Sequence, residues 1–228
     1  MKKVSVIIFL LFFVQTSYAQ IIGKIIHKNG KVQKISISTG EYSDLSVGSQ
    51  IRKGEKIKTG EKSVTQVLLK DGTTIKIYEK SHIFFIDYKK ETKDSPTKIN
   101  LEYGKVRIMS KFRFNKLSMV VTTPTSVISL VLADFGIIAA ELETKVLVYS
   151  SKVGIANINP DLQTAYVLYK GEEITVKKNR VLDEPKKISE STMRWWFENY
   201  KVIDKNRRII HFEKDHDFID WLLRKREF

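Results

Sequence analysis

Between Ile21 and Lys178 the chain consists of short apolar and β-branched runs, repeated roughly every ten residues and separated by turns that contain Gly or Asp. Val, Ile, Thr and Tyr fit the pleated, half-buried surface of a strand, and the runs lack the period of a helix. The runs that we expect to form strands are 21–26, 31–37, 64–69, 73–78, 82–88, 98–101, 104–109, 118–123, 126–132, 137–142, 145–149, 153–158, 164–169 and 173–178. The pattern predicts a mainly β fold, an antiparallel β-roll or solenoid-like or jelly-roll-like domain.

The first nineteen residues have the three parts of a secretory signal peptide. Lys2 and Lys3 precede an apolar run of eleven residues, 4–14, and the segment ends in small residues up to Ala19. A helix needs about 20 apolar residues to cross a bilayer, so a run of this length favours a cleaved signal over a membrane anchor. We expect cleavage after Ala19 and an exported chain, periplasmic or otherwise extracytoplasmic, without a transmembrane helix.

The chain contains no cysteine among its 228 residues. This excludes disulfides, thiolate zinc sites, iron–sulfur clusters and cysteine nucleophiles. An exported chain without disulfides depends on its apolar core alone, and roughly 200 residues are enough to bury one. The formal net charge of +14 favours polyanions as possible ligands.

Asp71-Gly72 stands between two apolar runs and is a strong hairpin signal. A two-residue loop would place polar residues opposite apolar ones. A loop of three residues, 70–72, with Gly72 in the left-handed conformation, pairs Val67 with Ile75 and leaves Lys76 on the outer face. This register puts four apolar residues on one face, namely Val67, Leu69, Ile75 and Ile77.

After Pro185 the pattern changes from strands to helices. We assign residues 20–182 to the β domain and 183–228 to a small helical tail packed on it. Ser189 or Ser191 is expected to cap a first helix, and Asp215 a second. The first helix has an apolar stripe at helical spacing, formed by Met193, Trp196, Phe197 and Tyr200.

Several short motifs follow one another along residues 24–178. They are a lead-in with two Gly-led turns at 45–60, a strand pair around Asp71-Gly72, a leucine-x-x-glycine-x-valine step at 101–106, a Thr-Pro strand at 120–124 and a closing strand at 168–176. In this order they resemble a FecR domain, the extracytoplasmic β domain of the iron-dicitrate-sensor regulator family. The residues at the motif positions, which we expect to be structural, are Gly54, Thr59, Gly60, Asp71, Gly72, Gly104, Thr123, Pro124, Phe135 and Gly171.

The chain departs from this family pattern in two places. The usual Gly-Thr-x-Phe step is Leu132-Ala133-Asp134-Phe135 here, so the bend that Gly would permit is altered. Membrane-spanning regulators of the family carry a cytoplasmic sigma-factor-binding segment and a transmembrane helix before this domain, where this chain has a signal peptide. The resemblance implies a free-standing FecR-like protein of a bacterial cell envelope.

The histidines do not indicate a catalytic or metal site. His27, His82, His211 and His216 lie in unrelated segments, and motifs for nucleophiles and phosphate loops are absent from the sequence. We therefore expect a protein that is not an enzyme and uses no cofactor or metal.

The lysines between Lys31 and Lys90 are spread singly along the predicted strands. Such charges commonly protect sheet edges against pairing, whereas nucleic-acid binding needs a localised basic stripe with stacking aromatic residues. We expect no nucleic-acid partner, and an anionic envelope glycan or lipid is the alternative partner for the lysines.

Trp195-Trp196 and Trp221 either close the hydrophobic end of the β domain or form a binding patch. Trp195 lies off the apolar stripe of its helix and is the candidate partner contact. Three functions stay open: a binding or scaffold module that contacts another envelope protein, a module attached to anionic polymer through its lysines, and an undetected hydrolase. Salt dependence separates the first two, because charge-led attachment weakens with ionic strength.

Overall fold

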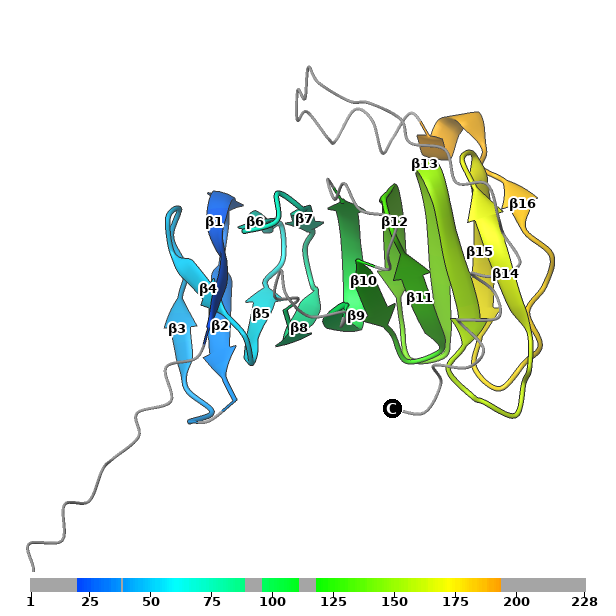
Figure 1. Cartoon of the computed structure of the whole chain (residues 1–228). Helices are drawn as coiled ribbons and strands as arrows, with labels where there is room; N and C mark the ends of the chain where they lie inside the picture. Colours follow the sequence, from blue (N-terminus) through cyan, green and yellow to red (C-terminus); the bar gives the residue numbers. More distant parts are fainter. Residues whose placement is uncertain (1–19, 38, 89–95, 111–117, 194–228) are drawn as a thin grey trace, which may run out of the picture.

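The computed structural model describes residues 20–37, 39–88, 96–110 and 118–193. These residues form a long stack of β-strands with one short helical segment at the end (Figure 1). The mainly β fold predicted from the sequence is confirmed. The predicted signal peptide lies outside the described residues, and so does the tail after Met193.

The strands form two sheets that share two long strands. Sheet A has the order β4 (Gln50–Arg52), β1 (Ile21–Asn29), β6 (Val64–Leu69), β7 (Thr74–Ile77), β9 (Thr97–Met109), β12 (Ala133–Ala139), β13 (Glu143–Asn157), β15 (Glu172–Lys177) and β16 (Lys186–Lys187). Sheet B has the order β3 (Tyr42–Asp44), β2 (Val32–Ser36), β5 (Glu55–Thr59), β8 (His82–Asp87), β9, β10 (Met119–Thr122), β11 (Ser126–Leu130), β13 and β14 (Ala165–Tyr169). The pairs are antiparallel except β9 with β10, which is parallel.

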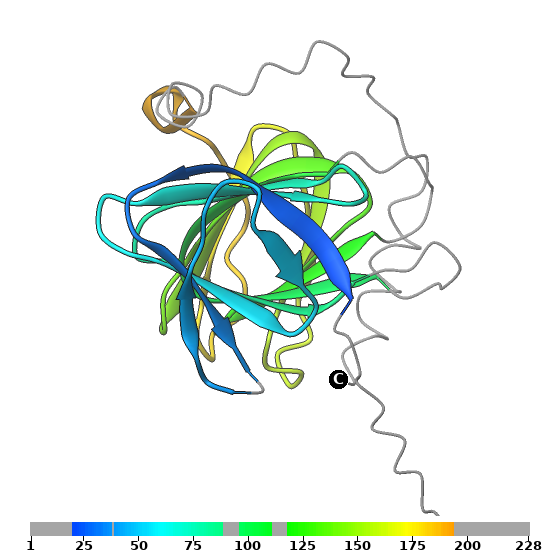
Figure 2. The same ribbon diagram turned by 90° about the vertical axis from the view of Figure 1, so that its left-hand side faces the viewer.

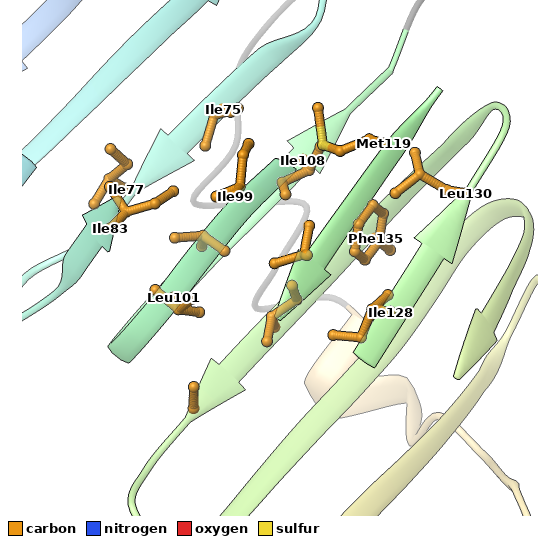
Figure 3. Close-up of a cluster of buried hydrophobic side chains, with 14 of the residues drawn as sticks. Ile75, Ile77, Ile83, Ile99, Leu101, Ile108, Met119, Ile128, Leu130 and Phe135 are labelled. Atoms are coloured by element: carbon orange, nitrogen blue, oxygen red, sulfur yellow. The ribbon is translucent and has the colours of Figure 1, made fainter. Parts of the chain in front are cut away.

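The apolar core lies between the two sheets, whose ribbons are seen end-on in Figure 2. Side chains alternate along each strand between the core and an outer face. In β9, Val106 and Ile108 belong to the core and Arg107 lies on the outer face of sheet A. Figure 3 shows how side chains from both sheets meet, among them Ile99 of sheet B and Phe135 of sheet A.

The hairpin of β6 and β7 has the predicted three-residue loop. Val67 pairs with Ile75, and the Leu69 amide donates to the Thr73 carbonyl oxygen at 2.8 Å. Gly72 has φ +85°, the left-handed conformation that the loop requires. All four residues predicted for the inner face are buried in the core, namely Val67, Leu69, Ile75 and Ile77.

Two pairs of predicted strands are single long strands. Segments 98–101 and 104–109 are both part of β9, and segments 145–149 and 153–158 are both part of β13. Gly104 (φ +106°) lies inside β9 and Ser151 (φ +64°) inside β13, so each strand turns there from one sheet into the other. The sequence predicts two separate strands in each case, because polar residues or glycine interrupt the apolar run at these positions.

Other strand boundaries also differ from the prediction. The segment predicted at 137–142 is Ala133–Ala139, which includes the departure from the family pattern and contains a bulge between Asp134 and Phe135. The three strands between residues 42 and 59 are not among the predicted ones, and Gly48 and Gly54 interrupt the apolar pattern there.

One corner geometry occurs twice in the fold. Lys31 and Lys105 each donate a backbone amide to a serine hydroxyl, Ser63 at 2.8 Å and Ser81 at 2.9 Å respectively. Each serine hydroxyl also donates to the carbonyl oxygen two residues before it. The residue before each lysine is a glycine with positive φ, so the segments Gly-Lys-Val and Glu-Lys-Ser meet in the same way at both corners.

The strands around these corners correspond as well, with the two sheets exchanged. Val32 pairs with Thr59 in sheet B as Val106 pairs with Ile77 in sheet A. On the other side of each corner, β1 pairs with β6 in sheet A as the first half of β9 pairs with β8 in sheet B. Residues 21–109 therefore contain an approximate internal twofold that exchanges the two sheets.

Candidate functional site

Three residues of the family motifs lie at the two serine corners of the fold, Thr59 and Gly104 at the Ser81 corner and Gly60 at the Ser63 corner. The Thr59 hydroxyl donates to the Tyr78 carbonyl oxygen at 2.5 Å and accepts from the Ser81 amide at 3.0 Å. The next residue, Gly60, donates its amide to the Lys31 carbonyl oxygen at 2.9 Å. A Cβ on Gly104 would lie 2.4 Å from Ser81 Cα. These residues hold backbone segments together.

The remaining motif residues lie in turns or in the core. Gly54 (φ +81°) and Gly171 (φ +87°) form turns, and Asp71 accepts the Thr73 amide at 2.8 Å. Thr123 and Pro124 stand in the turn between β10 and β11. The Thr123 hydroxyl bonds the hydroxyls of Ser126 and Thr144, both at 2.8 Å, and Phe135 is fully buried in the core.

The outer face of sheet A holds a buried ion pair. Arg107 donates to Asp134 through two bonds, Nε to Oδ1 at 2.7 Å and Nη2 to Oδ2 at 2.8 Å. The guanidinium also lies 4.6 Å from the ring centroid of Tyr149. Burial raises the pKa of the Tyr149 hydroxyl above its usual range and that of Tyr78 to about 12, so both phenols are neutral in ordinary buffers.

The C-terminal segment of the described chain packs on this same face. Ile188 and Met193 contact the cluster of Leu147 and Tyr149 on β13. The Thr192 amide donates to the Ser189 hydroxyl at 3.2 Å, which makes Ser189 the cap of the helical segment beginning at residue 190. The predicted contact residue Trp195 lies outside the described residues, as do Trp196, Phe197, Tyr200 and Trp221.

The outer face of sheet B carries exposed apolar side chains. Tyr42 on β3, Ile35 on β2, Lys56 on β5 and Phe84 on β8 follow one another in register across four strands. Tyr42 is 58% exposed, and Ile86, the next outward residue after Phe84, is 37% exposed. We call Tyr42, Ile35, Phe84 and Ile86 the apolar strip. Tyr42 and Ile86 are exposed, Ile35 and Phe84 are half-buried, and Lys56 lies between the latter two in register. Exposed apolar residues that gather on one face mark contact surfaces.

A charged cluster adjoins the apolar strip. Glu102 on β9 accepts from Lys56 Nζ through Oε1 and from His82 Nδ1 through Oε2, the latter at 2.7 Å. Lys56 Nζ also lies 5.4 Å from the ring centroid of Phe84. Burial alone would raise the pKa of Glu102, but Lys56 and His82 lower it overall, so Glu102 is ionised at neutral pH. The sequence did not suggest this cluster, because its members lie on three separate strands.

The described part of the chain contains no group of three or more side chains suited to a metal ion. Within the same residues, no helix is long and apolar enough to cross a membrane. An anionic polymer is the alternative partner predicted for the lysines. Several of the described lysines have carboxylate partners within the chain, such as Lys34 with Glu55 at 3.0 Å and Lys53 with Asp87 at 2.8 Å.

Residues 55–154 match the model of the FecR protein family. This stretch of the chain is FecR-like. The matched residues run from β5 into β13, so they include the Ser81–Gly104 corner and Phe135. The resemblance seen in the sequence motifs is confirmed for this region.

Two crystal structures of a protein from Parabacteroides distasonis ATCC 8503, described as a "putative anti-sigma factor", resemble this chain in fold. Both superpose with a TM-score of 0.51 at 19% sequence identity and cover 62% of this chain. The chain spans 64% and 63% of the two crystallised chains, which is less than two thirds of their length. No curated protein matches the chain.

Proposed function

We propose that this protein is a non-enzymatic, extracytoplasmic binding or scaffold module of a bacterial cell envelope, which contacts another envelope protein in sensing or signalling. Two findings support a regulatory role: the FecR domain itself, and the description of the structural neighbour as an anti-sigma factor. We further propose that the chain reaches this compartment by cleavage after Ala19. N-terminal sequencing of the exported protein tests that step, and an intact Met1 would contradict it.

The apolar strip is the observation that carries the proposed binding role. Tyr42 lies on β3, the outermost strand of sheet B, and no strand of the described chain pairs with the free edge of β3. An extended segment of a partner that adds to this edge would continue the sheet and place its own apolar side chains beside Tyr42 and Ile35. We therefore propose an extended strand of an envelope protein as the occupant.

The competing hypothesis is attachment to anionic glycan or lipid through lysines. Lys34, Lys53, Lys56, Lys80 and Lys145 each have a carboxylate partner within the described residues, which reduces the charge available to a polyanion. The two hypotheses predict different salt behaviour. Strand addition persists in high salt, whereas attachment through lysines is lost.

Site-specific photo-crosslinking in envelope preparations tests the proposal. A photoreactive residue replaces Tyr42 in one variant and Tyr169 in a matched control, because Tyr169 is 44% exposed on β14, the terminal strand at the opposite end of sheet B. We expect one protein to be captured from position 42 in low and high salt, and not from position 169. Ile86→Ser should abolish the capture and Ile158→Ser should not, since Ile158 is similarly exposed outside the strip.

Equal capture from both positions would contradict a site on the apolar strip. Capture that disappears in high salt would favour the lysine hypothesis. Trp195 stays a proposed second contact, tested by the same crosslinking at position 195.

A further inference from the structure

Among the members of the charged cluster beside the apolar strip, His82 is the one whose ordinary pKa lies nearest to neutral pH. Its Nδ1 is bonded to Glu102, so the neutral ring carries its proton on Nδ1 and donates it to the carboxylate. Its Nε2 is buried and has no hydrogen-bond partner among the described residues. Protonation would therefore place a second N–H where neither an acceptor nor solvent receives it.

The charged groups around the ring come from the two strands that flank β8. Lys56 and Lys58 face it from β5, and Glu102 faces it from β9, where the Tyr103 ring also lies at 5.6 Å. Burial is the largest influence and lowers the pKa of His82; the two lysines act in the same direction, and Glu102 opposes them. The site thus holds a neutral imidazole at neutral pH.

The cluster is connected to the binding surface through Lys56. The same ammonium group is bonded to Glu102 and lies over the ring of Phe84. Phe84 and Ile86 follow His82 on the same face of β8. A change in the His82–Glu102 bond would therefore alter the position of Lys56 over the Phe84 ring.

We propose that protonation of His82 disrupts the Glu102–Lys56–Phe84 arrangement and makes partner binding at the apolar strip weaker in acid. This inference rests on the proposed function, since it concerns regulation of the same surface. An envelope protein that contacts its partner through this surface would respond directly to the pH outside the cytoplasm.

The first experiment uses the protein alone. Nuclear magnetic resonance follows the His82 ring and the Phe84 ring from about pH 8 to about pH 5. We expect the titration midpoint of the His82 ring to lie below the usual value for histidine of about 6.5. The chemical shifts of the Phe84 ring should change with the same midpoint. The exposed residue His27 on β1 provides the matched control, and His27→Gln should leave the Phe84 titration unchanged.

The second experiment measures photo-crosslinking from position 42 over the same pH range. We expect the yield to fall roughly tenfold in the natural chain and in His27→Gln, because uptake of the proton by His82 opposes binding. In His82→Gln the yield should stay constant, because a glutamine amide can donate to Glu102 but cannot take up a proton.

The two experiments separate failure of the switch from failure of the binding role. A Phe84 ring that does not follow His82, or a pH profile of His82→Gln equal to that of the natural chain, would overturn the switch while capture at neutral pH upholds the binding role. No capture from position 42 at any pH would overturn the binding role, and with it the regulation proposed for it.

Discussion

Arg107 and Asp134 lie on neighbouring strands of sheet A and form a two-bond ion pair that is almost completely withdrawn from solvent, with 1% and 5% of their side chains exposed. The pair lies on the outer face of the sheet, away from the core between the sheets. Asp134 belongs to the segment where the chain departs from the family pattern. The departure therefore supplies the partner that a buried arginine requires.

Loss of one partner of this pair should be more damaging than loss of both. Arg107→Met leaves Asp134 buried without its partner and should lower the free energy of unfolding by about 3–5 kcal/mol. The double variant Arg107→Met with Asp134→Leu should recover much of that loss, since apolar residues of similar volume replace a buried pair well. Urea unfolding of the three proteins provides the comparison, and a double variant less stable than Arg107→Met would contradict this account.

Gly104 should be far less tolerant of a side chain than Gly48, although both have positive φ. Gly104→Ala places a methyl group against Ser81 backbone and side-chain atoms, with Cα at 2.4 Å, and should cost about 2–5 kcal/mol. A Cβ on Gly48 (φ +91°) would meet no atom within 4 Å, so Gly48→Ala should cost only about 1–2 kcal/mol. Thermal unfolding measures both. Equal costs would show that the corner relaxes to admit the methyl group.

The protein should lose stability in mild acid because of His82. Its folded pKa is lowered, chiefly by burial, so the unfolded chain binds the proton first as the pH falls below about 6.5. The contribution of neutral His82 is therefore fully present above that pH and decreases below it. His82→Gln should flatten the change in melting temperature between about pH 7 and pH 5. His27→Gln should retain the full change in melting temperature. If the melting temperature of His82→Gln fell as steeply as that of the natural chain, groups other than His82 would be responsible.

The two adjacent tryptophans of the tail should behave differently. The apolar stripe of the predicted helix includes Met193, which packs on Leu147 and Tyr149, and continues to Trp196. Trp196→Ala should cost about 3–5 kcal/mol as a core truncation, whereas Trp195→Ala should change stability little and weaken partner capture. Two melting curves and one crosslinking assay decide this. A larger loss of stability in Trp195→Ala than in Trp196→Ala would mean that the helix packs on the β domain through the side that carries Trp195.

Local features of the sequence were predictable where neighbouring residues decide the structure. The hairpin of β6 and β7 followed from Gly72 and from the alternation of Val67 and Ile75 with polar residues, because a wrong register would expose those side chains. The cap at Ser189 was one of two predicted serines, since a hydroxyl just before a helix can receive its free amides.

The internal twofold had a signal in the sequence that we did not use. Gly-Lys-Val occurs at 30–32 and 104–106, and Glu-Lys-Ser at 61–63 and 79–81. Triplets this short are uninformative alone. Their meaning comes from the bond between the amide of the lysine after each glycine and one serine hydroxyl, which joins segments far apart in the chain.

The sequence alone determined the β class of this protein, its FecR-type motifs and the turns that need glycine, because these depend on residue type and on near neighbours. Tertiary structure alone decided that Arg107 finds Asp134, that Gly104 bends a continuous strand around Ser81, and that Glu102 joins His82 to Lys56. Each of these contacts joins residues on different strands, and the sheet register that brings them together arises only when distant strands pair around a common core.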